Sequence, residues 1–274
     1  MIKDVKIAVL DLYEGQPNEG MRCIRELIGN FVHTAPVPVS YDVFDVRLQN
    51  QVPDMQYDLY ISTGGPGSPV ESEGSAWEEL YFELIESIRN HNRRFPEHKK
   101  YVFLICHSFQ VFCRYYGFGE VTQRKSTSFG VFPVHRTAQG LQELFFENLD
   151  DPFWAVDSRD WQVTGLNETL LSEWGGQVLC YEKIRPHVDL ERAVMAIRFD
   201  DAFFGTQFHP EADAEGMLRH FQKKEKMDMV IEKFGIEKYH AMIRYLADPD
   251  KIALTHDTVI PAFLKMAIPH SVEM

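Results

Sequence analysis

A cysteine in the middle of the chain stands where its thiol could serve as a nucleophile. Cys106 follows five apolar or aromatic residues, 101–105, and a stretch with helical character begins directly after it. A buried strand that turns into a helix at a cysteine is the outline of a nucleophile elbow. In that turn the nucleophile is raised above the sheet, and the next backbone N–H helps to form an oxyanion hole. Taken alone, however, a buried cysteine is more often a structural core residue than a nucleophile.

The segment Gln207-Phe-His-Pro-Glu211 supplies the partners that a cysteine nucleophile needs. It follows a predicted last strand that begins at Phe203. Such a cysteine requires a base to form the thiolate and to protonate the leaving amine, and the base requires an orienting carboxylate. His209 and Glu211 are one residue apart and could lie side by side. Cys106, His209 and Glu211 match no standard zinc spacing, so we expect no metal ion there. No other cofactor is expected.

A loop rich in glycine and proline precedes the cysteine. Residues 62–69 read Ser-Thr-Gly-Gly-Pro-Gly-Ser-Pro and follow a predicted strand, 57–62. Ligands of open α/β sheets bind at the carboxyl ends of strands, and glycine lets the backbone approach them closely. No Gly-Lys-Ser/Thr follows, so the loop is not a Walker loop. It is either a ligand-binding loop or an ordinary turn.

The elements that must position these residues alternate between strand and helix. Apolar runs predict strands at 6–10, 41–46, 57–62 and 101–105, and helical spacing predicts helices at 21–28, 77–88 and 108–116. This rhythm is typical of a doubly wound, mostly parallel α/β sheet with flanking helices. Shorter strands are expected from about 127 to 206. After about residue 215 the pattern is helical, so we predict a catalytic domain at 1–215 and a helical C-terminal extension at 216–274 for packing or for a homodimer.

Composition excludes several classes of function. The net charge of −13 over 274 residues argues against a nucleic-acid-binding surface. No run of about 18 apolar residues predicts a membrane span, and charges interrupt the first ten residues, unlike a signal peptide. The four cysteines have no C-x-x-C spacing and no pattern of a secreted disulfide scaffold. A reduced cytoplasm is therefore the expected compartment.

Taken together, these motifs resemble the class I (triad) glutamine amidotransferases over roughly residues 5–215. Residues 62–69 look like the oxyanion loop of that family, and residues 207–211 look like its His/Glu segment, its most specific marker. The resemblance implies a flavodoxin-like fold. It also implies that Cys106 attacks the carboxamide of glutamine to form a γ-glutamyl thioester and release ammonia. His209 would act as base and then acid, and Glu211 would orient it.

The resemblance extends to residues around the substrate. It implies that the backbone N–H groups of Gly65 and His107 hold the oxyanion. It also places Gly67 and Gln110 at the substrate, with Gln110 contacting the substrate amide. No synthetase domain follows His209. The ammonia acceptor would therefore be bound by a separate protein, or the substrate would be a free γ-glutamyl compound.

Three positions around the nucleophile depart from the family pattern Gly-x-Cys-x-Gly. Leu104 and Ser108 stand where small residues are usual, and Phe109 replaces a His or Met before the glutamine. Two alternatives therefore remain. Cys106 and His107 could form the Cys-His pair of DJ-1-like and intracellular-peptidase hydrolases, or the domain could be a non-catalytic regulatory protein.

Overall fold

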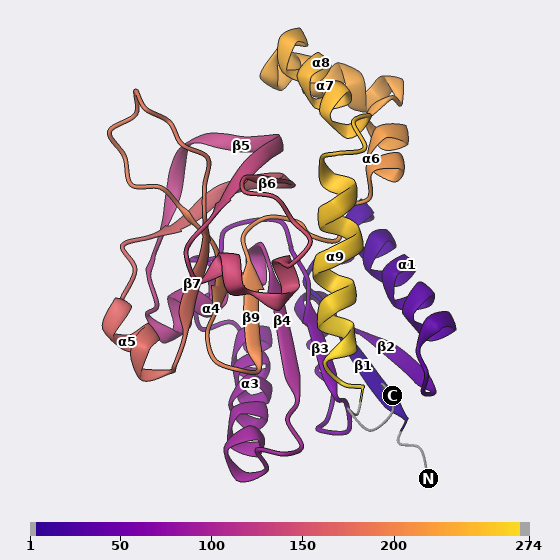
Figure 1. The fold of residues 1–274 in the computed structure, drawn as a ribbon, viewed down its shortest axis with the longest axis vertical. Coiled ribbons are helices and arrows are strands. Elements are labelled where there is room, and N and C mark those ends of the chain that lie inside the picture. The colour runs from indigo at the N-terminus through magenta and orange to yellow at the C-terminus, as the bar shows by residue number, and fades with distance from the viewer. Residues whose placement is uncertain (1–3, 269–274) are drawn as a thin grey trace.

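The structure, a computed structural model, describes residues 4–268. The strands, in chain order, are β1 (Val5–Asp11), β2 (Val39–Asp45), β3 (Leu59–Ser62), β4 (Tyr101–Ile105), β5 (Glu120–Arg136), β6 (Phe153–Thr164), β7 (Gln177–Tyr181), β8 (Val194–Arg198) and β9 (Phe203–Thr206). The helices are α1 (Glu19–Thr34), α2 (Val46–Gln49), α3 (Ala76–Arg94), α4 (His107–Tyr116), α5 (Glu168–Glu173), α6 (Ala214–Phe221), α7 (Lys224–Phe234), α8 (Ile236–Leu246) and α9 (Ile252–Lys265). These elements form an α/β fold around one nine-stranded sheet (Figure 1).

The parallel half of the sheet has the flavodoxin-like order. Its five strands lie in the sequence β2-β1-β3-β4-β9, and each neighbouring pair is parallel. The strands are apolar on both faces because helices cover both sides of such a sheet. On β4, Phe103 and Ile105 face the α1 and α9 side, whereas Val102 and Leu104 face the α3 and α4 side.

The prediction of a mostly parallel sheet is correct for only half of it. The remaining pairings, β9–β8, β8–β7, β7–β5 and β5–β6, are antiparallel. The ribbon of β5 and β6 is much longer than the short strands predicted there, since β5 alone has 17 residues. A register shift between Gln123 and Ser128 interrupts the pairing of β5 with β6. Polar and aromatic side chains along this ribbon interrupt the alternation of apolar and polar residues that would have predicted two long strands.

Two helix boundaries also differ from the prediction. The apolar residues of the helix predicted at 21–28 are buried in α1. The N-cap of this helix, Asn18, accepts a hydrogen bond from the Met21 N–H at 2.8 Å. The helix does not end at Gly29 but continues to Thr34, because Phe31 also packs into the core. At the other end of the chain, the spacing of Val259, Phe263 and Met266 predicts a helix with Pro261 near its start. Helix α9 instead begins at Ile252, so Pro261 lies inside it.

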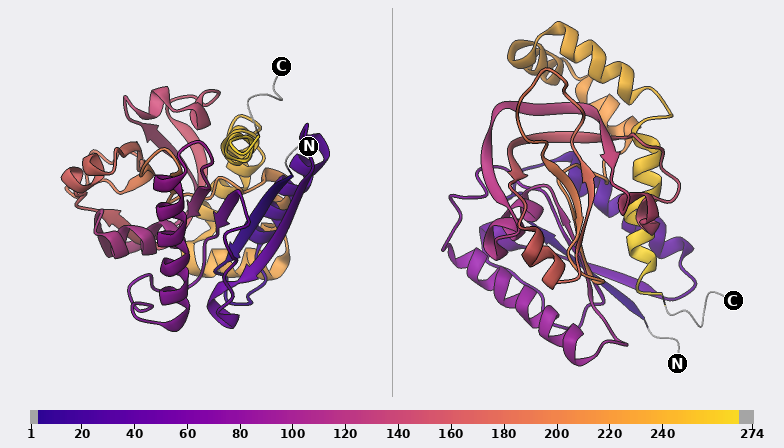
Figure 2. Two further views of the ribbon diagram at one scale, coloured as in Figure 1. Left: turned by 90° about the horizontal axis from the view of Figure 1, so that it is seen from below. Right: turned by 60° about the vertical axis from the view of Figure 1, so that its left-hand side comes forward.

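The C-terminal helices occupy two places. Helices α6, α7 and α8 lie together at one end of the molecule, beyond the carboxyl ends of the parallel strands (Figures 1 and 2). Helix α9 runs back along the sheet, and its Val259, Ile260 and Phe263 are fully buried in the same core as α1. No helix within residues 4–268 is long and apolar enough to cross a membrane. The division of the chain at 215/216 stays a prediction.

Candidate active site

The turn between β4 and α4 holds Cys106 in an unusual backbone conformation. Its φ of 49° and ψ of −95° lie in a region that non-glycine residues rarely occupy. Such a conformation costs about 1–3 kcal/mol and persists only where its surroundings enforce it. The Ser108 hydroxyl does so, since it accepts from the Ile105 N–H at 2.9 Å and donates to the Ser62 carbonyl at 2.8 Å. This strand–turn–helix geometry is that of a nucleophile elbow.

The bulk of Leu104 and Phe109 is accommodated by a glycine on the neighbouring strand. Leu104 pairs with Gly205 of β9. A Cβ atom on Gly205 would lie 2.5 Å from the Phe109 ring and 3.3 Å from the Leu104 Cβ, closer than real side chains pack. Both larger side chains are fully buried. Gly205 therefore leaves the space beside the elbow that Leu104 and Phe109 occupy.

The structure brings His209 and Glu211 to Cys106. They follow β9, which is the parallel neighbour of β4, so both segments leave the sheet at the same edge. The His209 Nδ1 lies 2.8 Å from Glu211 Oε1. Since a carboxylate can only accept, Nδ1 carries the proton and Nε2 is left for the thiol. Burial lowers the pKa of His209, but Glu211 and a hydrogen-bonded Cys106 outweigh it and raise that pKa well above its ordinary value.

The His107 side chain has different electrostatic neighbours. Its ring is buried, and burial together with the positive charges of Arg47 and Arg114 lowers its pKa to about 3. Its Nε2 has no hydrogen-bond partner among residues 4–268. The ring is therefore neutral at physiological pH and cannot act as a cationic partner for a thiolate. Its backbone N–H, at the N-terminus of α4, remains the group expected at the oxyanion.

The glycine-rich loop is fixed by an arginine from α2. The Arg47 Nη1 donates to the carbonyls of Pro66 at 2.7 Å and Leu12 at 3.2 Å. Gly65 lies so close to β1 that a Cβ atom there would be 2.5 Å from the Leu12 carbonyl oxygen. Gly67 has a φ of 85°, which favours glycine. Both glycines line the pocket that contains Cys106.

Tyr13, which follows the carboxyl end of β1, was not predicted as part of the site. Tyr13 lines the pocket with Cys106, His209 and Glu211. Burial, followed by the charges of Glu211 and Cys106, raises the pKa of Tyr13 well above its ordinary value, so its hydroxyl stays protonated. Nothing in the sequence around Tyr13 or Arg47 marks them, because their roles depend on contacts between segments far apart in the chain.

Gln110 lines the pocket but already has partners. Its Nε2 donates to the Trp161 carbonyl and to the Gln207 Oε1, each at 3.1 Å. Gln207 is fully buried and accepts a further bond from the Val163 N–H at 3.3 Å. The two glutamines thus connect α4 to β6 and to the segment after β9. The predicted contact of Gln110 with the substrate stays a prediction.

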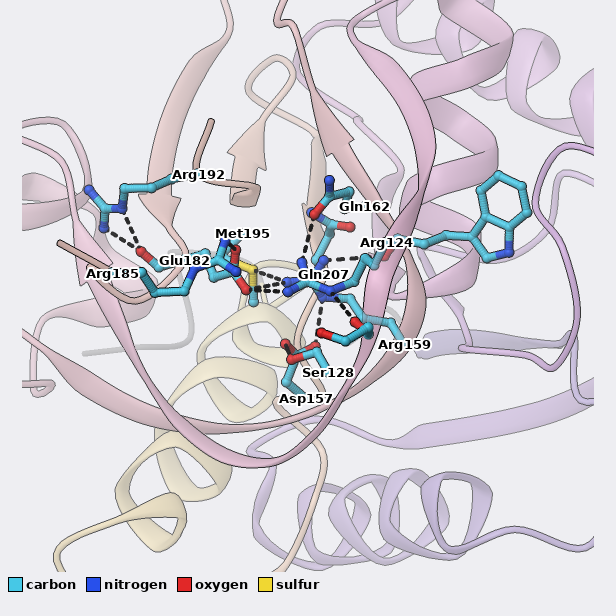
Figure 3. Close-up of polar contacts among 12 residues, drawn as sticks. Arg124, Ser128, Asp157, Arg159, Gln162, Glu182, Arg185, Arg192, Met195 and Gln207 are labelled. Atoms are coloured by element: carbon cyan, nitrogen blue, oxygen red, sulfur yellow. Dashed lines mark hydrogen bonds and ion pairs between the residues drawn. The ribbon is translucent and has the colours of Figure 1, made fainter. Parts of the chain in front are cut away.

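A buried network of charges supports the strand next to Cys106. The Cys106 Sγ lies 3.9 Å from the Ser158 carbonyl oxygen on β6. The next residue, Arg159, is almost fully buried and donates from Nε to Asp157 at 2.8 Å, with its Nη2 3.5 Å from Glu182. Arg124 of β5 reaches the same Glu182 at 2.8 Å. Figure 3 shows these side chains converging between β5, β6 and the segment after β7.

The pocket around Cys106 has a volume of about 530 Å³ and two walls of different origin. One consists of the segments after β1, β3 and β4 and part of β6. The other comes from the C-terminal helices and includes Met217 of α6 and Met229, Lys233 and Phe234 of α7. Within residues 4–268, no group of three or more His, Cys, Asp or Glu side chains could hold a metal ion.

Comparisons with known proteins identify the family and the fold. The family model described as "Glutamine amidotransferase class-I" matches residues 21–227, most of the chain. A comparison with curated proteins gave no match. Among solved structures, a glutamine amidotransferase from Thermotoga maritima is similar over 98% of this chain and 99% of its own, with a TM-score of 0.68 and 16% identity.

Two further structures have the same fold. A glutamine amido transferase from Methylobacillus flagellatus covers 97% of this chain and 95% of its own, with a TM-score of 0.63 and 18% identity. The glutaminase domain of CTPS from Trypanosoma brucei, with bound acivicin, covers 76% of this chain and 86% of its own, with a TM-score of 0.53 and 14% identity. By the family model that spans most of its length, this chain belongs to the class I glutamine amidotransferase family.

Proposed function

We propose that the protein hydrolyses the γ-carboxamide of glutamine or of a γ-glutamyl compound through a thioester on Cys106. The observation that carries this proposal is the elbow at Cys106, whose side chain hydrogen-bonds to His209, which in turn is held by the buried Glu211. An inert core cysteine requires neither a φ of 49° nor a charged partner. A degenerate, non-catalytic domain would have no reason to retain both.

The reaction follows from the positions of these groups. His209 takes the thiol proton, and the Cys106 sulfur attacks the γ-carbonyl carbon, while Glu211 stabilises the imidazolium. The backbone N–H groups of Gly65 and His107 stabilise the oxyanion. The C–N bond then breaks as His209 gives its proton to the leaving nitrogen. Water, deprotonated by His209, hydrolyses the thioester to a free γ-carboxylate and regenerates the thiol.

The test is release of glutamate from glutamine and from γ-glutamyl amides by the purified chain. Turnover of at least one compound is expected, and Cys106→Ala should reduce it to the background rate. Cys113→Ala is the matched control, because Cys113 is fully buried and does not line the pocket. Equal loss in both variants, or no turnover of any compound, would contradict the proposal. The separate synthetase, the homodimer and the cytoplasmic location stay predictions.

A further inference from the structure

We infer that the preferred substrate is a γ-glutamyl peptide bearing an apolar amino acid on its γ-amide nitrogen, rather than glutamine itself. This inference rests on the proposed hydrolysis at Cys106. It arises from the wall that the C-terminal helices add to the catalytic pocket, which creates a subsite for whatever is attached to the leaving nitrogen.

The pocket is larger than free glutamine requires. Pockets of about 300–1,000 Å³ hold drug-sized ligands, and the pocket around Cys106 has about 530 Å³. Free glutamine is smaller than such ligands and would leave much of this space to water. A γ-glutamyl dipeptide has roughly twice the number of non-hydrogen atoms and fills the space better. The volume therefore favours a substrate with a substituent on the amide.

The leaving group departs on the side of the thiol where His209 lies. The leaving nitrogen takes its proton from His209, so a substituent on that nitrogen lies on the His209 side of the thiol. The backbone N–H of His209 donates to the Val156 carbonyl of β6 at 2.9 Å. Val156 packs in one core with Phe221 of α6 and Val230 of α7. On this side, the pocket is consequently bounded by β6, α6 and α7.

Aromatic and thioether side chains line this side of the pocket. Phe129 is the cross-strand partner of Ser158, whose carbonyl contacts the Cys106 sulfur. Its ring stacks on Phe234 of α7, with centroids 4.8 Å apart and an interplanar angle of 4°. Both rings line the pocket together with Met217 and Met229. Aromatic and thioether side chains in a concave wall favour an apolar side chain on the substrate.

A lysine that could bind a carboxylate also lines the pocket. Apart from the catalytic His209, the cationic side chains that line the described pocket are Arg159 and Lys233. Arg159 is already engaged by Asp157 and Glu182. Lys233 has no carboxylate partner within residues 4–268, and its Nζ lies 5.1 Å from the Phe234 ring. A carboxylate beside an apolar side chain is what the terminal amino acid of a γ-glutamyl dipeptide presents. Lys233 would pair with that carboxylate, and the reaction would yield glutamate and the free amino acid.

The inference is tested with four substrates measured on the same preparation. They are glutamine, γ-glutamyl-glycine, γ-glutamyl-phenylalanine and γ-glutamyl-phenylalaninamide, which lacks the carboxylate. We expect kcat/KM for γ-glutamyl-phenylalanine to exceed that for glutamine by about 10- to 100-fold, with γ-glutamyl-glycine between them. Glutamine turned over as well as the dipeptide would overturn the inference while supporting the proposed hydrolysis. No turnover of any of the four would overturn both.

Two variants locate the subsite. Lys233→Met should reduce the preference for γ-glutamyl-phenylalanine over its amide by about fivefold, the scale of an exposed ion pair. Phe234→Ser should reduce the preference for phenylalanine over glycine. Lys224→Met, on an exposed lysine of α7 that does not line the pocket, is the control. Because each readout is a ratio from one preparation, partial unfolding does not alter it. Ratios unchanged in both pocket variants, or equally changed in the control, would overturn the inference.

Discussion

Replacing His209 by alanine is expected to lower kcat/KM for hydrolysis of the best γ-glutamyl amide by about 10³-fold or more. The imidazole both removes the thiol proton and protonates the leaving nitrogen, and a positioned acid–base group contributes about 10²–10⁴-fold to such a step. The pKa of His209 also bears on the pH dependence of the reaction. Burial lowers this pKa, but Glu211 and Cys106 outweigh burial and raise it well above its ordinary value. The pair formed when His209 takes the thiol proton, an imidazolium beside the Cys106 thiolate, should persist above pH 6.5. Activity should therefore be retained there and decline on the alkaline side, where the imidazolium loses the proton that the leaving nitrogen needs. The measurement is kcat/KM as a function of pH.

His107→Phe is the matched comparison for this prediction. Phenylalanine keeps a ring of similar volume in a buried position and retains the backbone N–H expected at the oxyanion. The imidazole it replaces has no hydrogen-bond partner at Nε2 among the described residues and is neutral at physiological pH. We expect kcat/KM to change by less than about tenfold. Activity that survives His209→Ala and is lost in His107→Phe would instead support the Cys-His pair of DJ-1-like hydrolases.

The second large effect concerns stability. Glu182→Gln is expected to reduce the free energy of unfolding at pH 7 by about 3–5 kcal/mol, because it leaves buried positive charge without its counter-ion. Glu182 is buried and contacts Arg124, Arg159 and Arg185, the last at 2.9 Å. After the substitution, Asp157 alone would balance Arg124 and Arg159. Denaturant unfolding curves of the two proteins give the difference.

The pKa of Glu182 determines how the stability difference between wild type and Glu182→Gln depends on pH. Burial raises the pKa of Glu182, but the charges of Arg159 and Arg124 outweigh it and lower the pKa below its ordinary value. A carboxyl with a lower pKa in the folded state stabilises the fold above the unfolded pKa of about 4.3, and this stabilisation is lost as the pH falls through the folded pKa. The gap between wild type and Glu182→Gln should be constant from about pH 7 to 5 and narrow below about pH 4.3.

Glu97→Gln is the control for the same experiment. Glu97 is exposed and has no ion pair among residues 4–268, so its neutralisation should change the free energy of unfolding by less than about 0.5 kcal/mol. A Glu182→Gln protein as stable as this control at pH 7 would show that the buried charges do not support the strand beside Cys106.

Sequence motifs predicted the parallel half of the fold and the residues brought together there. Cys106 and His209 each follow an apolar strand, and the carboxyl ends of parallel neighbours lie at one edge of a sheet. The prediction therefore needed only the order of a few strands. The family relationship was also predicted, from the glycine-rich loop and the segment 207–211, and the match over residues 21–227 confirms it.

The parts that sequence reasoning missed depend on contacts between distant segments. Leu104, two residues before Cys106, departs from the family pattern, yet its compensating partner, Gly205, is a strand residue that nothing in the sequence distinguishes. The charge network joins Arg124, Asp157 and Glu182 from three separate segments. Likewise, a helical pattern was predicted after about residue 215, but nothing in it indicated that Lys233 and Phe234 would line the catalytic pocket.

The central claim is that Cys106 forms a covalent γ-glutamyl thioester. Its most direct test is mass spectrometry of the protein quenched in acid during turnover of a γ-glutamyl amide, with the modified peptide sequenced. The account predicts a γ-glutamyl group on the peptide that contains Cys106, absent from Cys106→Ala and unchanged in Cys113→Ala. Turnover with Cys106 unmodified, or a γ-glutamyl group found on another cysteine, would contradict it.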